Sequence, residues 1–346
     1  MKKITYILLS LLLAGAVSCD GETSSSFYDH PHHTVNGGED KPNPEPDPDK
    51  PEKPEYDNTV YQLDNSLWKT TTVSDGVVWK NFEATDVISG AAQIVNVLDV
   101  DLSAGKNDFK LVYYYPSVTT SAAMAKEKAV GAINAGYELA SIFVKVAGQT
   151  YGSIKNAYIA NVVPQWKNEG ALFIDGDNVN ISYCCKGMKL PAQRQFYLSC
   201  TEPNIISSAP MLIDDFEPVG EVFAKTDLTY EQILTLNSED PIRHQTVRHP
   251  RTAIAKTENN HILLITVDGR HSGVSEGMSA KELTIFLKNW FKPQYALNLD
   301  GGGSTTMCVK GQGDASTNVV NYPCDNGKFD HSGERARDTH ICVIPR

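Results

Sequence analysis

Two nearly continuous apolar runs constrain the fold more than any other part of the sequence. HILLITV ends at Asp268 and YALNL ends at Asp300, and a glycine follows each aspartate. Such runs are typical of central strands that are buried on both faces of a sheet. Between them lies a helix that Ser279 and Glu282 begin as a capping box. A strand-helix-strand crossover joins parallel strands, so we expect both carboxylates side by side at the carboxyl edge of the sheet, a recurrent position for active sites.

Glycine and hydroxyl residues follow Asp300 in the sequence LDGGGSTTM. An Asp-Gly dipeptide most often only turns the chain, and this interpretation stays open for both aspartates. Three consecutive glycines lose much backbone entropy on folding, however, and a binding role would explain them. A ligand can approach a backbone without side chains, and successive N–H groups can form a nest for an anion. The candidate binding residues are Gly301, Gly302, Gly303, Ser304 and Thr305.

Helix and strand patterns elsewhere predict an α+β fold, with a mixed β-sheet, a few packed helices and a site at strand ends. Thr229 and Gln232 form a second capping box, and SAAMAKEKAV indicates a weaker helix. FIDGDNVNI is typical of a hairpin that turns at Asp-Gly. The other expected strands are DFKLVYYY, SIFVKV, QFYLSC and TAIAKT.

Residues 1–18 have the pattern of a signal peptide. Two lysines precede an apolar run that is short for a membrane span, and small residues lead into Cys19. The sequence AVSC resembles a bacterial lipobox, which implies cleavage before Cys19 and acylation of its thiol. We therefore expect an exported protein that is lipid-anchored to a bacterial membrane, on its periplasmic face or at the cell surface. An ordinary secretory signal is the alternative, and it too places the domain outside the cytoplasm.

Residues 19–58 are expected to form a disordered, solvated spacer after the lipidated cysteine. Residues 39–57 contain six prolines, eight acids and three lysines, a composition that cannot bury apolar surface. Residues 59–117 then form an N-terminal subregion of unknown role, and residues 118–346 form the main domain. The spacer carries five (eight minus three) of the eleven net negative charges. The rest of the chain is mildly acidic and has no basic stripe, so no nucleic acid partner is expected.

Familiar motifs for several other chemistries do not occur. Six cysteines follow Cys19, none of them in a CxxC zinc pattern, and no HExxH segment is present. In an exported protein we expect some of these cysteines to form disulfides. The sequence has no phosphate-loop lysine, no GxGxxG motif and no GxSxG elbow around Ser304, which argues against a nucleotide-binding protein and a serine hydrolase. An anion held beside paired carboxylates remains.

The segment NLDGGGSTTM resembles the signature of the phosphodiester glycosidase family. Other segments follow in family order: AINAGYE, SAPMLI, RHPRTAIA, VDGR, VVNYPCDN and GERARDTHICVI. Ala209 in SAPMLI stands where the family commonly has glycine. The resemblance covers roughly residues 118–346 and leaves out residues 59–117. It implies a hydrolase that cleaves the glycosidic bond of a sugar-1-phosphodiester into free sugar and phosphomonoester, acting on surface or environmental glycans.

The charged residues suit the implied chemistry. A guanidinium fork binds two phosphate oxygens at once, and the phosphate-binding candidates are Arg251, Arg270 and Arg335. A carboxylate can assist an oxocarbenium-like sugar or the attacking water, so Asp300 and Asp268 are the catalytic candidates, with their roles left open. The resemblance adds two substrate-binding candidates, Asn134 and Asn321.

Two other functions remain open at this stage. A metal-dependent phosphodiesterase on the same scaffold would use Asp268, Asp300 and Asn134 as oxygen ligands of a divalent cation. A carbohydrate-binding surface lipoprotein with a decayed site is the other alternative, although the intact aspartates and glycines argue against it. The main hypothesis requires no cofactor and no metal. Its partners are a phosphorylated carbohydrate and, through the lipid anchor, the membrane.

Overall fold

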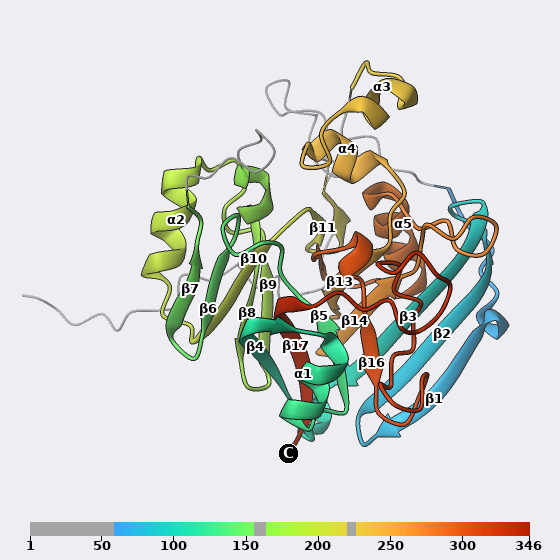
Figure 1. Ribbon diagram of the computed structural model, residues 1–346, viewed down its shortest axis with the longest axis horizontal. Helices are drawn as coiled ribbons and strands as arrows, with labels where there is room; N and C mark the ends of the chain where they lie inside the picture. The colour runs from blue at the N-terminus through green and yellow to red at the C-terminus, as the bar shows by residue number, and fades with distance from the viewer. Residues whose placement is uncertain (1–58, 156–163, 220–225) are drawn as a thin grey trace, which may run out of the picture. The chain divides into compact units, whose positions relative to one another are not determined.

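The computed structural model describes residues 59–155, 164–219 and 226–346, in which antiparallel strand pairs form three sheets (Figure 1). The first sheet has eight strands in the order β1-β2-β3-β14-β13-β15-β11-β12. Its strands are β1 (Trp68–Ser74), β2 (Val77–Asp86), β3 (Ala91–Asp101), β14 (His261–Val267), β13 (Arg251–Lys256), β15 (Tyr295–Asn298), β11 (Met211–Asp214) and β12 (Glu217–Pro218).

The other two sheets are smaller. The five-stranded sheet contains, in spatial order, β7 (Gln149–Ser153), β6 (Phe143–Val146), β10 (Asn204–Ser208), β8 (Gly170–Asp175) and β9 (Asn178–Ser182). The four-stranded sheet contains, in spatial order, β16 (Met307–Val309), β5 (Gly131–Asn134), β17 (Arg337–Pro345) and β4 (Asn107–Val118).

Helices complete the predicted α+β fold, which the structure confirms. The α-helices are α1 (Thr120–Glu127), α2 (Leu190–Ser199), α3 (Tyr230–Thr235), α4 (Pro241–Thr246) and α5 (Ala280–Trp290). Short 3-10 turns occur at η1 (Asn65–Leu67), η2 (Leu102–Ala104), η3 (Pro164–Asn168) and η5 (Gly302–Ser304). In Figure 1, α2 lies beside the five-stranded sheet and α5 beside the eight-stranded sheet.

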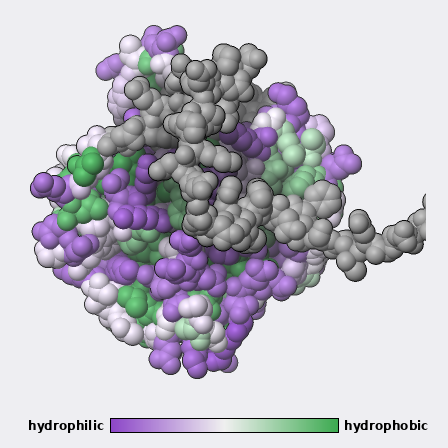
Figure 2. All heavy atoms as spheres, turned by 180° about the vertical axis from the view of Figure 1, so that it is seen from behind, coloured by the Kyte–Doolittle hydropathy of each residue, from purple (hydrophilic) through white to green (hydrophobic). Residues whose placement is uncertain are grey.

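The eight-stranded sheet has an apolar cluster on each face. Along β14, Ile262 and Leu264 join a cluster that includes side chains of the other two sheets. The alternate residues Leu263 and Ile265 join a second cluster with Phe286 of α5. This double burial explains why the strand reads as a continuous apolar run. On the outside, hydrophilic residues predominate among the coloured residues of the face shown in Figure 2.

The prediction that β14 and β15 run in the same direction is correct, but the prediction that they are adjacent is wrong. β14 and β15 each pair antiparallel with β13, so they run in the same direction and α5 connects them. They are not adjacent, because β13 lies between them and bonds to both. Double burial, which the apolar run does indicate, is therefore produced here by an antiparallel sheet that is covered on two sides.

The local helix and turn predictions are confirmed in most cases. Ser279 and Glu282 form the capping box of α5, and Thr229 and Gln232 form that of α3. The weaker predicted helix is α1. β8 and β9 pair as a hairpin whose turn contains Gly176 at φ +63°, a conformation that glycine adopts easily.

The segment QFYLSC is a helix and not the expected strand. It belongs to α2, which begins at Leu190 with a proline in its first turn. Leu190, Gln193 and Tyr197 are buried on one face, with the spacing i, i+3 and i+7 of an amphipathic helix. Tyr197 packs flat against Phe143 of β6, with ring centroids 5.2 Å apart. The helical spacing of buried residues begins at Leu190, upstream of the QFYLSC segment that suggested a strand.

Residues 59–117 form part of the main fold. β3 pairs with β14 over seven residue pairs, and β4 pairs with β17 in a different sheet. Lys53–Arg346 accordingly forms one compact unit. Residues 59–117, whose role the sequence left open, therefore supply strands to the eight-stranded and the four-stranded sheets.

The prediction of partial disulfide pairing is wrong for the described residues. All six of their cysteines are free thiols: Cys184, Cys185, Cys200, Cys308, Cys324 and Cys342. Three of them are buried, as is common for thiols that only pack. A domain with two apolar clusters on one sheet does not depend on covalent links for its core.

The N-terminal predictions fall outside the described residues. The signal peptide, the lipobox at Cys19 and the spacer all lie in residues 1–58. No helix in the described ranges combines the length and the hydrophobicity needed to cross a bilayer.

Phe82 tests whether the N-terminal strands are integral to the core. It is fully buried and packs on Trp68, Phe286 and Trp290 at centroid distances of 5.3 to 6.0 Å. We expect Phe82→Ala to lower the free energy of unfolding of the whole domain by about 3–5 kcal/mol, because a buried aromatic ring is lost. Lys69→Ala, on the same segment with a side chain 76% exposed, should change it by less than about 0.5 kcal/mol. Denaturant unfolding measures both, and an unchanged main transition in Phe82→Ala would show that the segment is an appendage.

Candidate active site

The two Asp-Gly dipeptides meet at Pro250, just before β13. A Cβ on Gly269 would lie 2.8 Å from the nitrogen of Pro250, and one on Gly301 would lie 2.7 Å from its carbonyl oxygen. The N–H of Gly302 donates to the same carbonyl at 2.8 Å. Both dipeptides therefore lie at one edge of the sheet, as their positions after β14 and β15 predicted. Glycine is required at these positions because the backbones touch.

The remaining glycines make room for arginine side chains. Gly302 has φ +62°, and a Cβ there would lie 3.1 Å from Nη2 of Arg270. A Cβ on Gly303 would lie 2.5 Å from Nη2 of Arg335. The glycine run thus allows two guanidinium groups to rest on the backbone. Both arginines were predicted to bind phosphate, and the structure places their guanidinium groups at the glycine loop.

The predicted nest of free N–H groups is not formed. Within the loop, the N–H of Ser304 donates to Gly301 and that of Thr305 to Gly302, both at 3.2 Å. Together with the bond from Gly302 to Pro250, these contacts use most of the donors that the nest would need. If an anion binds here, its partners are therefore the guanidinium groups at the loop and not a nest of N–H groups.

Asn134 holds the loop closed. Its Nδ2 donates to the carbonyl of Asp300 at 2.7 Å, and its Oδ1 accepts from the N–H of Thr306 at 3.0 Å and from Thr252 Oγ1 at 2.9 Å. The side chain is fully buried. The substrate-binding role predicted for Asn134 is therefore corrected to a positioning role.

Asn321 has a similar structural role. It is fully buried; its Nδ2 donates to Asp268 and to the carbonyl of Thr305, and its Oδ1 accepts from the N–H of Met307. It ties the chain after β14 to the far end of the glycine loop. This residue, too, positions the site and does not present its amide to a ligand.

Asp268 is buried behind the loop and uses both oxygens internally. Oδ1 accepts from Asn321 Nδ2 at 2.8 Å and Oδ2 from the N–H of Tyr322 at 3.0 Å. Burial raises the pKa of Asp268 to about 7, although these two hydrogen bonds favour the ionised form. Because its oxygens are engaged and its side chain is covered, we interpret Asp268 as an anchor for the segment that begins at Asn321.

Arg251 is also directed inward. Its Nε donates to the carbonyl of Met278 at 2.8 Å, and its Nη2 donates to the carbonyls of His244 and Val247 at 2.7 and 3.0 Å. Only 1% of the residue is exposed. A guanidinium that satisfies three buried carbonyls holds the chain around β13, so we assign it a structural role in place of phosphate binding.

Asp300 faces a set of charges that includes residues missed by the sequence analysis. Nη2 of Arg337 lies 3.1 Å from Asp300 Oδ2 and 4.0 Å from Glu138 Oε1. Glu138 in turn lies 3.4 Å from Nζ of Lys167, a buried lysine that also pairs with Glu239 at 2.5 Å. The charges therefore alternate in sign along one series, and each lies next to a charge of opposite sign. The series is Asp300, Arg337, Glu138, Lys167 and Glu239.

The two carboxylates of this series have different environments. Burial raises the pKa of Asp300, and the charge of Arg337 limits the rise. Burial acts in the same direction on Glu138, but Lys167 and Arg337 outweigh it and hold its pKa below the usual range. The side chain of Glu138 is 51% exposed, against 12% for Asp300. Carboxylates with opposite shifts commonly divide the roles in acid-base catalysis.

Sequence signals for the missed residues existed but were weak. Arg337 follows Arg335 by two positions, the spacing that places side chains on one side of an extended chain. Glu138 ends the AINAGYE segment, directly after Tyr137. Lys167 lies in η3 and has no counterpart in any motif that the sequence analysis used.

Several polar atoms around the loop are buried without a hydrogen-bond partner. They are Asp300 Oδ2, Ser304 Oγ, Thr305 Oγ1, Thr306 Oγ1 and Arg337 Nε. Asp300 Oδ2 has only its ion pair with Arg337. Buried polar groups in native proteins are normally satisfied, so such a group of atoms in one place indicates a position that water or a ligand completes.

A metal-binding arrangement is not favoured by these contacts. The alternative function would need oxygens of Asp268, Asp300 and Asn134 to converge on one cation. Asn134 Oδ1 and both oxygens of Asp268 instead accept hydrogen bonds from the protein. Within the described ranges, no cluster of three or more His, Cys, Asp or Glu side chains is placed to hold a metal ion.

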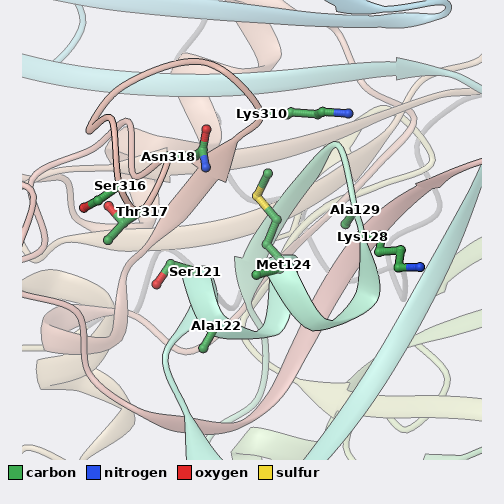
Figure 3. Close-up of a pocket in the computed structure, with 10 residues that line it drawn as sticks. Ser121, Ala122, Met124, Lys128, Ala129, Lys310, Ser316, Thr317 and Asn318 are labelled. Carbon is green, nitrogen blue, oxygen red and sulfur yellow. The ribbon is translucent and has the colours of Figure 1, made fainter.

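A separate pocket of about 370 Å³ lies between α1 and the 310–318 loop, and Figure 3 shows its lining. Two lysines contribute to it together with small and polar residues, and none of the predicted site residues is among them. The lining residues are Ser121, Ala122, Met124, Ala125, Lys128, Ala129, Lys310, Ser316, Thr317 and Asn318. The candidate active site is defined by its polar contacts and not by this pocket.

Comparisons with known proteins identify a family for this chain. A family model described as phosphodiester glycosidase matches residues 127–344, which contain the glycine loop and all the charged residues above. No curated protein matches the sequence at the significance level applied.

One solved structure shows a similar fold. The catalytic domain of zebrafish N-acetylglucosamine-1-phosphodiester alpha-N-acetylglucosaminidase, auto-inhibited by its pro-peptide, has a TM-score of 0.53 and 18% sequence identity. That match covers 84% of this chain and 86% of the zebrafish chain. A hypothetical protein from Synechocystis has a TM-score of 0.47 and 15% identity, and the match covers 81% of this chain and 64% of that chain.

Asp268 makes stability depend on pH in a defined direction. Its pKa of about 7 means that the folded state keeps a proton that the unfolded chain loses near pH 4. The stability from this group is complete below about pH 4 and is lost as the pH rises through about 7. Residue 268 does not titrate in Asp268→Asn. Between about pH 4 and pH 7, the free energy of unfolding of the wild type should therefore fall relative to that of the variant by up to about 1.4 kcal/mol per pH unit.

Denaturant unfolding at several pH values measures this difference. Asp75→Asn, at an exposed position, serves as the control and should follow the wild-type profile. Parallel profiles for Asp268→Asn and the wild type would contradict a buried, protonated Asp268.

Proposed function

The chain belongs to the phosphodiester glycosidase family and is a glycosidase that acts on phosphodiester-linked sugars; we propose that it cleaves the bond between C1 of the sugar and the phosphodiester oxygen. The products are a free sugar and a phosphomonoester. The observation that carries this proposal is the glycine loop itself. Two guanidinium groups lie over it, and a carboxylate and three hydroxyl groups with unsatisfied buried atoms surround its ends.

Arg270 and Arg335 are suited to hold the phosphodiester. Both guanidinium groups contact the loop, at Gly302 and Gly303, and planar forks of this kind bind phosphate oxygens better than lysine does. Arg335 is oriented by an ion pair with Asp325. Arg270 has φ +65°, a backbone conformation that is uncommon outside glycine and that persists only where its surroundings favour it. The hydroxyls of Ser304 and Thr305 can donate to the same anion.

Asp300 and Glu138 supply the chemistry at the sugar. In the proposed step, Glu138 accepts a proton from water while the water oxygen bonds to C1, and the C1–O bond breaks with its electron pair left on the phosphate oxygen. To Asp300, which pairs with Arg337, we assign the stabilisation of the oxocarbenium-like sugar by its negative charge. A phosphomonoester is a good leaving group, so a strong general acid is unnecessary.

The exported location remains part of the proposal. The lipobox at Cys19 would attach the enzyme to a bacterial membrane, and the spacer would let the domain reach surface or environmental glycans. N-Acetylglucosamine 1-phosphodiesters, the substrate class in the name of the zebrafish protein, are the first compounds to test. No observation favours the metal-dependent phosphodiesterase, because its predicted ligands have other partners.

Labelled water distinguishes the proposed reaction from phosphodiester cleavage at phosphorus. We expect hydrolysis in H₂¹⁸O to place the label in the free sugar, because water attacks C1. Asp300→Asn should fold normally and lose about 10²–10³-fold in kcat, since it keeps the shape and removes the stabilising charge. Asp175→Asn, in the exposed β8–β9 turn, is the matched control and should keep full activity. Mass spectrometry of both products gives the result, and label in the phosphate would refute C–O cleavage.

Membrane attachment can be tested independently of catalysis. If Cys19 is acylated, the wild-type protein should sediment with membranes, whereas Cys19→Ala should be released or should stall as the unprocessed precursor. Cys200→Ala, which changes a cysteine of the folded domain, should stay with the membranes. Fractionation and immunoblotting measure both variants. A processed Cys19→Ala protein that still sediments with membranes would argue against the lipid anchor.

A further inference from the structure

The pocket between α1 and the 310–318 loop separates two kinds of polar group. Its volume of about 370 Å³ lies within the range of about 300–1,000 Å³ that is usual for small-molecule sites. In Figure 3, its two lysines lie on one side, its hydroxyl-bearing residues lie on the other, and Met124 stands between them. We call this cavity the α1 pocket. None of the residues assigned to the candidate active site lines it.

The two lysines give the α1 pocket a cationic side. Lys128 and Lys310 are exposed, and neither ammonium group forms an ion pair with another described residue. The described lining residues include no aspartate or glutamate. The neighbouring Glu127 pairs instead with Lys110 and accepts from Tyr114, both at 2.6 Å. In a chain of net charge −11, two such lysines at one cavity favour an anionic ligand.

Lys128 occupies a backbone position that lysine rarely takes. It ends α1 with φ +54° and ψ +34°, the left-handed conformation that glycine or asparagine usually supplies at the end of a helix. A lysine there also interacts favourably with the helix dipole, which is its ordinary explanation. The dipole does not account for Lys310, which follows β16 in a distant part of the chain. Two separate segments therefore bring a lysine to the same cavity.

The opposite side of the α1 pocket presents hydrogen-bond acceptors. The hydroxyls of Ser316 and Thr317 donate to Oδ1 of Asp314 at 2.6 and 2.9 Å. The hydroxyl of Ser121 donates to Oε1 of Glu334 at 2.5 Å. A hydroxyl has a single proton, and these carboxylates accept it, so only the oxygen lone pairs remain for a ligand. This side therefore suits the hydroxyl groups of a ligand and disfavours a second anionic group.

The surface between the two sides is apolar. Met124 is 5% exposed, and Ala122, Ala125 and Ala129 lie beside it in the lining. A methionine side chain is flexible and adapts to the shape of what it contacts. A ligand that matches the whole pocket thus has an acid group at one end, C–H groups in the middle and hydroxyl groups at the other end. Sugar acids and sugar phosphates have this distribution.

We propose that the α1 pocket binds a monosaccharide that carries one acid group, a carboxylate or a phosphate. The acid group lies between Lys128 and Lys310, and the ring hydroxyls donate to the serine and threonine oxygens on the other side. The described lining offers no carboxylate that could act as an acid or a base, so we assign the pocket binding and not catalysis. This site is separate from the glycine loop and does not depend on the proposed function.

Methionine methyl groups allow the two sites to be observed separately. The full-length protein, labelled with ¹³C in these groups, is titrated with glucuronate or with glucose 6-phosphate and followed by NMR. Met124 reports on the α1 pocket, and Met307, which follows the glycine loop, reports on the candidate active site. We expect a saturable shift of the Met124 signal with at least one of the two acids. Glucose and acetate, which each lack part of the ligand, should bind at least about fivefold more weakly.

Variants of the two lysines test their role directly. Lys310→Gln and Lys128→Asn should each weaken binding at least about fivefold, because a charged hydrogen-bond donor is lost. Asparagine adopts the left-handed conformation more readily than lysine, so α1 should keep its end. Lys310→Arg keeps the charge and should keep the binding. Lys126→Gln is the matched control on the same helix, since its ammonium lies over the ring of Tyr114, and it should change binding less than about twofold.

Several outcomes would refute the proposal. They are a Met124 signal that shifts with neither acid, equal binding of acetate or glucose, and equal weakening in Lys126→Gln, which would indicate a general effect of charge. A response to glucuronate alone identifies a carboxylate, and a response to glucose 6-phosphate alone identifies a phosphate; either supports the site. None of these measurements uses hydrolysis, so a failure of the proposed function would leave their result unchanged.

Discussion

The buried amide of Asn134 is the contact on which the site depends. It lies at the end of β5 in the four-stranded sheet, yet it bonds to Thr252 of β13 in the eight-stranded sheet and to both ends of the 300–306 segment. One side chain therefore fixes two sheets and the glycine loop relative to one another. If this amide lost its partners, several hydrogen bonds would be missing in an environment without water, at a large cost in folding free energy. The observed arrangement is therefore strongly favoured.

Around this fixed point, charge is arranged as a chain of alternating sign. Asp300, Arg337, Glu138, Lys167 and Glu239 follow one another, and the last of these precedes α4. Each member is stabilised by its neighbours, so a half-exposed glutamate stays ionised next to a covered aspartate whose pKa is raised. The same chain connects the glycine loop with Trp166, whose Nε1 donates to the carbonyl of Glu239. The two candidate catalytic carboxylates and their ion-pair partners thus come from five separate parts of the sequence.

Local features of the fold could be read from the sequence because local physics decides them. The capping boxes of α3 and α5, the β8–β9 hairpin and the double burial of β14 all follow from short patterns. The insertion of β13 between β14 and β15 depends on long-range pairing, which no short pattern encodes. The glycine loop, Arg270 and Arg335 were also predictable, because short motifs contain them. Arg337 and Glu138 were not, because their place in the site depends on long-range contacts. Buried polar residues such as Asn134, Arg251 and Asn321 resemble ligand contacts in sequence, since burial is a property of the finished fold.

The pairing of β3 with β14 also has a consequence for how the enzyme can be divided. The family match begins at residue 127, but β14 receives seven of its residue pairs from a strand that ends at Asp101. A fragment cut at the family boundary would leave β14 as a long, apolar, unpaired edge. Such edges recruit strands from other molecules, so a fragment of this kind would aggregate. A soluble form of the enzyme must therefore retain β3, which ends 26 residues before the family match begins.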